Sequence, residues 1–335
     1  RPELSILLSY SKIVAFQQLR ESDVPEDPYL SKELVRYFPQ ALQERYADHM
    51  QRHRLRREII ATAVTNSMVN RMGATFTLRM TEDTGRTPAE VAKAYTIARE
   101  AVDARGLWAQ IDALDGKVPE SVQIDALKTI WSLLRTMSRW ILSRPGAIPE
   151  ITTAMARYGE GIKAVRDALP AVLSDTRRAA YDARLGEWKS KGVTAALATE
   201  LAALPTLEFA CDIVEIAQSR KLTPVDAAKA FFALGAALHL PWLYEQVDAL
   251  DVDGRWQALA RGALRALART VRRWAPCTSR SAKAGSWLDT GLSHDIAPSL
   301  TSSALSVPAK ALDSEATRKE VSGVTGSCSL LSTTP

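Results

Sequence analysis

Two histidines four residues apart offer the first sign of chemistry in this sequence. His49 and His53 fall in an expected helical segment, 40–72, where that spacing places both side chains on one face. Such a pair can hold a metal ion, but no cysteine or carboxylate nearby convincingly completes a site. We therefore expect solvated or paired surface histidines, and we predict no metal-binding residues in the chain.

The densest basic run lies within the same segment and is interleaved with acids. The arginines are Arg52, Arg54, Arg56 and Arg57, and the acids are Glu44, Asp48 and Glu58. On a helix this pattern predicts a charged face with ion pairs between residues four apart. A solvated face is the first interpretation and an interface with another domain or subunit is the second. A nucleic-acid partner is not predicted, because the acids oppose phosphate binding and no known module accompanies the arginines.

Other patterns that could carry chemistry are better explained by packing. The segment 158–161 (YGEG) lacks the preceding strand that a phosphate-binding loop needs. Cys211 stands in an apolar run and is typical of a buried small side chain. Asp112 and Asp115, three apart beside a helix end, more often cap or are solvated than act as acid and base. Because the sequence also has no G-x-G-x-x-G, P-loop, H-E-x-x-H or G-x-S-x-G motif, we predict no catalytic and no cofactor-binding residues.

The elements that carry these residues are expected to be helices. Apolar residues recur every three or four positions through the first 274 residues, and alanine, leucine, arginine and glutamate, all good helix formers, fill the windows between turns. Short helices are expected over 2–14 and 31–38, with Ser31 as N-cap, and a long one over 40–72 that ends at Gly73. The sequence predicts an all-α fold.

Two stretches of the sequence repeat at an offset of 136 residues. Residues 87–95 (TPAEVAKAY) match 223–231 (TPVDAAKAF), and 111–115 (IDALD) match 247–251 (VDALD). The match predicts an internally duplicated helical unit of roughly 60 residues. Thr87 and Thr223 are expected to cap helices that start with proline. Paired ligand contacts from Lys93 and Lys229 are the less favoured alternative to caps and core contacts.

Tryptophans and composition indicate where the folded part ends. We expect the seven tryptophans of the helical part to lie in the core: Trp108, Trp131, Trp140, Trp188, Trp242, Trp256 and Trp274. Residues 275–335 are rich in serine and threonine and have no apolar period, so we expect a disordered tail. The predicted division is therefore 1–274, with sub-units 1–145 and 146–274, followed by 275–335.

Charge and cysteine content exclude several classes of protein. Forty-three basic and 38 acidic residues give a net charge of +5, which is small for 335 residues and does not indicate nucleic-acid binding. Three cysteines cannot build a disulfide scaffold, and no apolar run reaches the ~20 residues of a membrane span. Without a signal peptide, a cytoplasmic protein with no membrane partner is expected. The absence of a starting methionine suggests a fragment.

Several segments, in order, resemble one known family. They are 1–12 (RPELSILLSYSK), 27–30 (DPYL), 34–39 (LVRYFP), 53–62 (HRLRREIIAT), 68–71 (MVNR), 107–115 (LWAQIDALD) and 255–261 (RWQALAR). They resemble the C-terminal helical region of the large bacterial NAD-specific glutamate dehydrogenases, over roughly residues 1–265. The resemblance implies, for the intact protein, oxidation of L-glutamate with NAD⁺ and water to 2-oxoglutarate, ammonium and NADH.

The resemblance implies a structural role for the chain itself. The family's catalytic lysine loop and nucleotide-binding glycines have no counterpart here, so none of its catalytic residues is carried over. We expect an inactive fragment that binds no NAD, packs on the catalytic domain of the same polypeptide and helps to hold a homo-oligomer. A free-standing helical scaffold that binds a partner through its arginine-rich face is the alternative. The sequence departs from the family after about residue 265, for which a reading-frame shift is one hypothesis.

Overall fold

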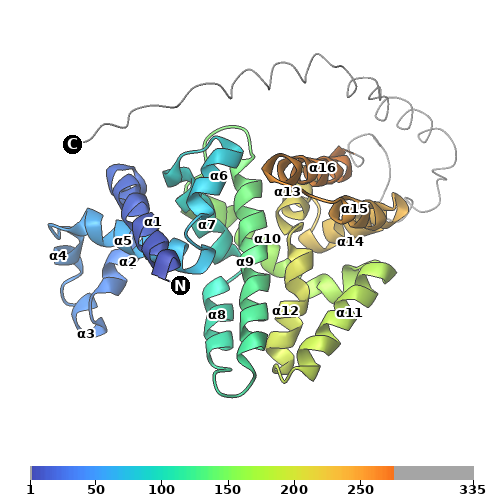
Figure 1. Ribbon diagram of the computed structural model, residues 1–335, viewed down its shortest axis with the longest axis horizontal. Coiled ribbons are helices and arrows are strands. Elements are labelled where there is room, and N and C mark those ends of the chain that lie inside the picture. Colours follow the sequence, from blue (N-terminus) through green and yellow to red (C-terminus); the bar gives the residue numbers. More distant parts are fainter. Residues whose placement is uncertain (1, 275–335) are drawn as a thin grey trace, which may run out of the picture. The chain divides into compact units, whose positions relative to one another are not determined.

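The structure is a computed structural model that describes residues 2–274 (Figure 1). Within these residues it consists of sixteen α-helices and one 3₁₀ helix, and it has no strand, so the all-α prediction is confirmed. The expected disordered tail, 275–335, lies outside the described residues. The first helices are α1 (Pro2–Glu21), the 3₁₀ helix η1 (Val24–Glu26), α2 (Ser31–Tyr37), α3 (Gln40–Gln43) and α4 (Ala47–Gln51).

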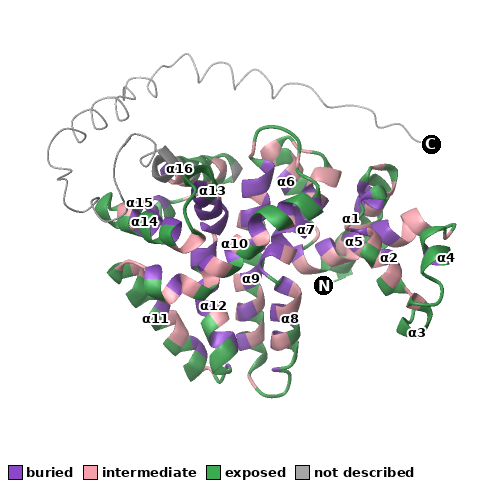
Figure 2. Ribbon diagram, turned by 180° about the vertical axis from the view of Figure 1, so that it is seen from behind, coloured by how far each residue is buried: buried purple, intermediate pink, exposed green. Residues whose placement is uncertain are grey.

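The single long helix expected over 40–72 is wrong. The chain instead forms α3, α4 and then α5 (Arg56–Met72), which ends at Gly73 as predicted. The reason is packing: α3 buries no residue and α4 buries only Met50, whereas α5 buries a continuous face. Figure 2 shows the same contrast, since α3 and α4 are largely exposed. Ser31 is also the first residue of α2 rather than its cap, which is Leu30.

Two runs of helices repeat each other. The first repeat contains α5, α6 (Phe76–Thr84), α7 (Pro88–Ala101), α8 (Ala104–Asp112) and α9 (Glu120–Leu142). The second contains α12 (Ala195–Leu207), α13 (Ala210–Arg220), α14 (Pro224–Ala237), α15 (Leu240–Ala249) and α16 (Arg255–Trp274). Both ends of α7 correspond to the ends of α14 at the offset found in the sequence, and α8 and α15 start at equivalent residues. The predicted duplication is therefore a duplication of helices.

The repeated helices begin with the same cap. In α7 the Thr87 hydroxyl accepts the N–H of Glu90 at 3.3 Å, and the Glu90 carboxylate accepts the N–H of Thr87 at 2.9 Å. In α14 the Thr223 hydroxyl accepts the N–H of Asp226 at 3.1 Å. These bonds satisfy amides that have no partner inside the helix, as the sequence predicted.

The turns of the two repeats also share a rare backbone conformation. Three non-glycine residues among those described have positive φ: Asp103 (51°), Lys221 (55°) and His239 (51°). Asp103 and His239 are equivalent and precede α8 and α15. Lys221 is equivalent to Gly85, which has φ 69°. Both repeats thus contain two left-handed turns, and one of these turns has glycine in the first repeat and lysine in the second.

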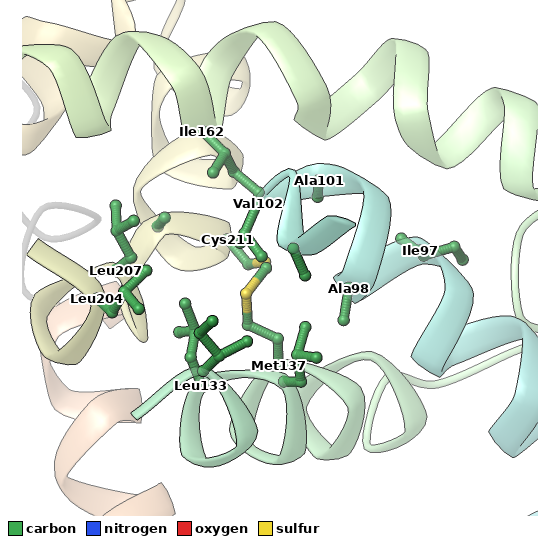
Figure 3. Packing of buried hydrophobic residues seen from close by; sticks show 14 of the residues in the cluster. Ile97, Ala98, Ala101, Val102, Leu133, Met137, Ile162, Leu204, Leu207 and Cys211 are labelled. Carbon is green, nitrogen blue, oxygen red and sulfur yellow. The ribbon is translucent and has the colours of Figure 1, made fainter. Parts of the chain in front are cut away.

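A common core joins the two repeats. Between them lie α10 (Ile151–Val172), which packs against both α7 and α14, and α11 (Asp175–Ser190), which packs against α12. Figure 3 shows buried side chains from α7, α9, α10, α12 and α13 in one cluster: Ile97, Ala98, Ala101, Leu133, Met137, Ile162, Leu204, Leu207 and Cys211. Each large apolar side chain buried here contributes about 2 kcal/mol. The cluster includes residues from both sides of position 145. The division into sub-units at that position stays a prediction.

The left-handed turns give a reciprocal test. Lys221→Gly is expected to raise the free energy of unfolding by up to about 1 kcal/mol, because glycine adopts φ 55° without a Cβ clash. Gly85→Ala is expected to lower it by a similar amount. Urea unfolding followed by circular dichroism measures both, and a destabilised Lys221→Gly variant would contradict this interpretation of the turn.

Candidate functional site

The structure separates the two histidines considered as metal ligands. α4 ends at Gln51, so His49 lies on this helix while His53 lies in the following turn. The His53 Nδ1 accepts the N–H of Leu55 at 3.1 Å, and its ring lies 5.6 Å from that of Phe38. The prediction that both histidines lie on one helix is therefore wrong. The prediction of a paired surface histidine describes His53. No cluster of three or more metal-ligating side chains occurs in residues 2–274.

The arginine run makes long-range ion pairs. Arg56 Nη1 and Arg57 Nη1 lie 2.7 and 2.6 Å from the two carboxylate oxygens of Glu26. Arg57 also donates to the carbonyls of Arg20 and Ser22 at 2.6 and 2.9 Å. The hydrogen bond from Arg56 is the largest cause that lowers the pKa of Glu26. The sequence predicted ion pairs between residues four apart on one helix, and these two arginines do not form them. They connect α5 to η1 and to the end of α1 instead.

The two repeated lysines are not brought together. Lys93 Nζ, on α7, lies 2.5 Å from Asp23 Oδ2, and its side chain is mostly buried. Lys229, at the equivalent position of α14, is exposed. The acid that pairs with Lys93 is the N-cap residue of η1, a helix that packs beside the first repeat. The two lysines are therefore not placed as a pair of ligand contacts, and the caps of the repeated segment are Thr87 and Thr223.

A buried charged cluster, which sequence reasoning missed, lies in the first repeat. Arg99 is 2% exposed. Its guanidinium donates to Ser67 Oγ at 2.8 Å and pairs with Glu100 at 2.6 Å. Glu33 of α2 lies 3.7 Å from Arg99 and 2.5 Å from Arg105. The cluster therefore ties α2, α5, α7 and α8 together, and its only sequence signal is an Arg–Glu pair inside an apolar helix face.

This cluster is absent from the second repeat. The residues equivalent to Arg99 and Glu100 are Gly235 and Ala236, neither of which can carry charge. Burial acts to raise the pKa of Glu100, but the charge and hydrogen bonds of Arg99, with those of Tyr29 and Arg105, outweigh it and lower that pKa. Burial beside Glu100 raises the pKa of Tyr29 to about 12. The lowered pKa of Glu100 and the raised pKa of Tyr29 keep the first ionised and the second neutral near neutral pH, which suits a structural role.

A second polar cluster joins the repeats beside a cavity of about 360 Å³. The Trp140 indole N–H donates to Asp212 Oδ1 at 2.9 Å, and the Arg144 guanidinium lies 4.0 Å from the Trp140 ring centre. Arg144 is also 3.5 Å from Asp212 and 3.6 Å from Glu215, which accepts the Tyr158 hydroxyl at 3.1 Å. The charges lining the cavity are thus paired within the protein, and they fasten α9 and α10 to α13.

Cys211 and the glycine pair both serve packing. Cys211 is buried, as predicted, and burial raises the pKa of its thiol, so the thiolate is not formed near neutral pH. Gly159 and Gly161 both lie inside α10. A Cβ at Gly161 would lie 2.7 Å from a methyl of Val214, so this glycine permits the close approach of α10 and α13.

The prediction that the tryptophans form the core is only partly right. Trp108, Trp140 and Trp188 are buried, but Trp131, Trp242 and Trp256 are 38, 60 and 80% exposed. The indole N–H of Trp131 donates to the carbonyl of Met72, the last residue of α5, at 3.0 Å. The side chain of Trp274 lies outside those described. Asp112 and Asp115 are exposed, and Asp112 lies 4.0 Å from Arg71.

The fold and its charged clusters define a class: an all-α region built from a duplicated unit of helices, in which the buried charges connect helices. The chain belongs to the family described as glutamate dehydrogenase, C-terminal, whose model matches residues 1–274. It is 38% identical over 264 residues to an NAD-specific glutamate dehydrogenase of Halomonas elongata and 37% identical over 265 residues to one of Pseudomonas aeruginosa. A third, from Mycobacterium tuberculosis, is 29% identical over 268 residues.

These matches cover 79% of this chain but only 16% of each relative. The relatives' names imply NAD, and the residues described here do not fit it. A dinucleotide is held by a glycine-rich turn between a strand and a helix. The paired glycines of this chain are inside a helix and one of them packs on Val214.

In the described part of the chain, no helix is long and apolar enough to cross a membrane.

The glycine in α10 can be tested against a matched one. Gly161→Ala is expected to lower the free energy of unfolding by about 1–3 kcal/mol, because its methyl group would overlap Val214. Gly186→Ala, in α11, meets no atom within 4 Å and is expected to raise it by about 0.5–1 kcal/mol. Chemical denaturation of both variants measures the difference. Equal stabilisation by both would refute a close helix contact.

The charged cluster makes a prediction about pH. The pKa of Glu100 is lowered in the folded state. The carboxylate therefore contributes fully to stability above the ordinary pKa of a glutamate, and this contribution is lost as pH falls through the lowered pKa. Glu100→Gln is expected to cost about 3 kcal/mol at pH 7, since it leaves Arg99 partly uncompensated. The cost should shrink at pH 4. Unfolding curves at both pH values measure it, and a cost that is the same at pH 4 would contradict this role.

Proposed function

We propose that this chain is the non-catalytic C-terminal helical region of an NAD-specific glutamate dehydrogenase. The whole enzyme would convert L-glutamate, NAD⁺ and water to 2-oxoglutarate, ammonium and NADH, with NAD bound elsewhere in the polypeptide. The observation that carries the proposal is the family match over residues 1–274, together with two relatives of that name at 38 and 37% identity. The role proposed for this region is to support the catalytic part.

The first turns of α1 support packing on the catalytic domain of the same polypeptide. Leu4, Ile6 and Tyr10 are 66, 69 and 65% exposed, and the first buried residue of α1 is Ala15. Exposed apolar side chains gathered on one helix mark contact with another protein surface. We assign this end of α1 to the contact with the catalytic domain.

The other expected partners follow from the same role. We propose a homo-oligomer in the cytoplasm, with neither nucleic acid nor membrane as a partner. Pairing of Arg56 and Arg57 with Glu26 leaves fewer free cations for phosphate. The alternative, a free-standing scaffold that binds through the arginine run, relies on Arg52 and Arg54, which are exposed. A reading frame upstream of Arg1 that encodes a dinucleotide-binding domain would favour the enzyme, and a start codon there the scaffold.

The purified chain is expected to form no NADH from glutamate and NAD⁺, because it supplies support and no catalytic group. The longer protein encoded with the upstream frame is the matched control and is expected to form NADH, as measured by absorbance. Turnover by the chain alone would overturn the non-catalytic assignment. A longer protein that is inactive towards glutamate would overturn the assignment to this enzyme.

A further inference from the structure

Three arginines meet on the surface where α6 packs against α9. Arg79 is an exposed residue of α6, and Arg135 and Arg139 lie one turn apart on α9. Arg139 Nη1 lies 2.9 Å from Asp83 Oδ2, so this arginine is paired. Arg79 and Arg135 form no ion pair with any residue in 2–274. We call these three arginines, together with Trp131 of α9, the α6–α9 patch.

The charge of the α6–α9 patch is not balanced within the described residues. In the clusters around Glu100 and Asp212, each arginine is paired with a carboxylate. At the patch, burial and then the charges of Arg139 and Arg79 lower the pKa of Arg135, and only the charge of Asp83 acts in the opposite direction. The lowered pKa means that a positive charge is disfavoured at this position. An anion placed here would relieve that repulsion.

The α6–α9 patch is held in place by contacts within the protein. The indole N–H of Trp131 donates to the carbonyl of Met72 at 3.0 Å, and the guanidinium carbon of Arg135 lies 5.6 Å from the centre of the Trp131 ring. Trp131 is 38% exposed and therefore presents an apolar surface beside the arginines. Because these side chains are already ordered, a partner that binds them loses less conformational entropy than one that must order them.

The composition of the α6–α9 patch favours a protein as the partner. Tryptophan and arginine are enriched among the residues that dominate binding between proteins. A small anion would be contacted from one side only, because the arginines lie on the exposed surface of two helices. Nucleic acid is disfavoured, since Glu82 and Asp83 follow Arg79 on α6 and would repel a chain of phosphates.

We propose that the α6–α9 patch binds an acidic segment of another protein chain. Its carboxylates accept hydrogen bonds from the guanidinium groups of Arg79 and Arg135, and an apolar side chain of the segment packs on Trp131. Each carboxylate replaces a repulsion between arginines with a charge-assisted hydrogen bond. The proposal concerns an interaction surface and does not depend on the assignment to the enzyme.

The test is calorimetric titration of the purified 335-residue chain with a hexaglutamate peptide at physiological salt. The wild type is expected to bind the peptide. The double variant Arg79→Gln/Arg135→Gln is expected to raise the dissociation constant at least about 10-fold, because it loses the hydrogen bonds to the carboxylates. Arg52→Gln/Arg54→Gln removes the same charge from two exposed arginines elsewhere and is the matched control. It is expected to change the dissociation constant less than about 2-fold, because it leaves the patch intact.

A wild-type chain that does not bind hexaglutamate would overturn the proposal, and so would an equal loss of affinity in the two double variants. A thymidine hexanucleotide, which carries phosphates instead of carboxylates, is expected to bind more weakly than the peptide. Tighter binding of the hexanucleotide at the patch would overturn the acidic protein segment in favour of nucleic acid.

Circular dichroism of each variant separates loss of binding from loss of the fold. If the change at Arg135 lowers the helix content, Arg79→Gln alone is compared with Arg54→Gln, since both side chains are exposed. The larger loss of affinity is expected from Arg79→Gln, and a larger loss from Arg54→Gln would contradict the proposal. Neither measurement involves turnover, so its result is independent of whether the longer protein is active towards glutamate.

Discussion

The apolar contact between the two repeats is the constraint on which the rest of the structure depends. Neither repeat buries its own apolar face completely: Leu133 and Met137 of α9 need Leu204 and Cys211 from α12 and α13. α10 packs on equivalent helices of both repeats and approaches α13 closely enough to require Gly161. The polar contacts at Trp140 and Asp212 lie at this junction and add direction to an otherwise apolar interface.

Duplication produced equivalent helices in unequal surroundings. The first repeat has α1, η1 and α2 beside it, and it contains a buried Arg99–Glu100 pair and an ion pair at Lys93. The second repeat carries Gly235 and an exposed Lys229 at those positions. Its apolar surface is correspondingly less covered.

Local features could be predicted from the sequence, and long-range partners could not. The caps at Thr87 and Thr223 and the end of α5 at Gly73 depend on a few neighbouring residues, and the sequence predicted all three. The division of the segment 40–72 into three helices depends on which of its helical turns pack against the rest of the protein. The partner of Arg56 is 30 residues away, and the exposure of Trp242 depends on an uncovered helix face. No local pattern contains that information.

The central claim is that the two repeats share one core and fold as one unit. Native-state hydrogen exchange measured at increasing urea concentrations tests it most directly, by comparing the amides of α7 with those of α14. If the account is right, the most protected amides of both helices will exchange with the same free energy of opening and the same dependence on urea. Opening of α14 at a clearly lower free energy, while α7 stays protected, would contradict it.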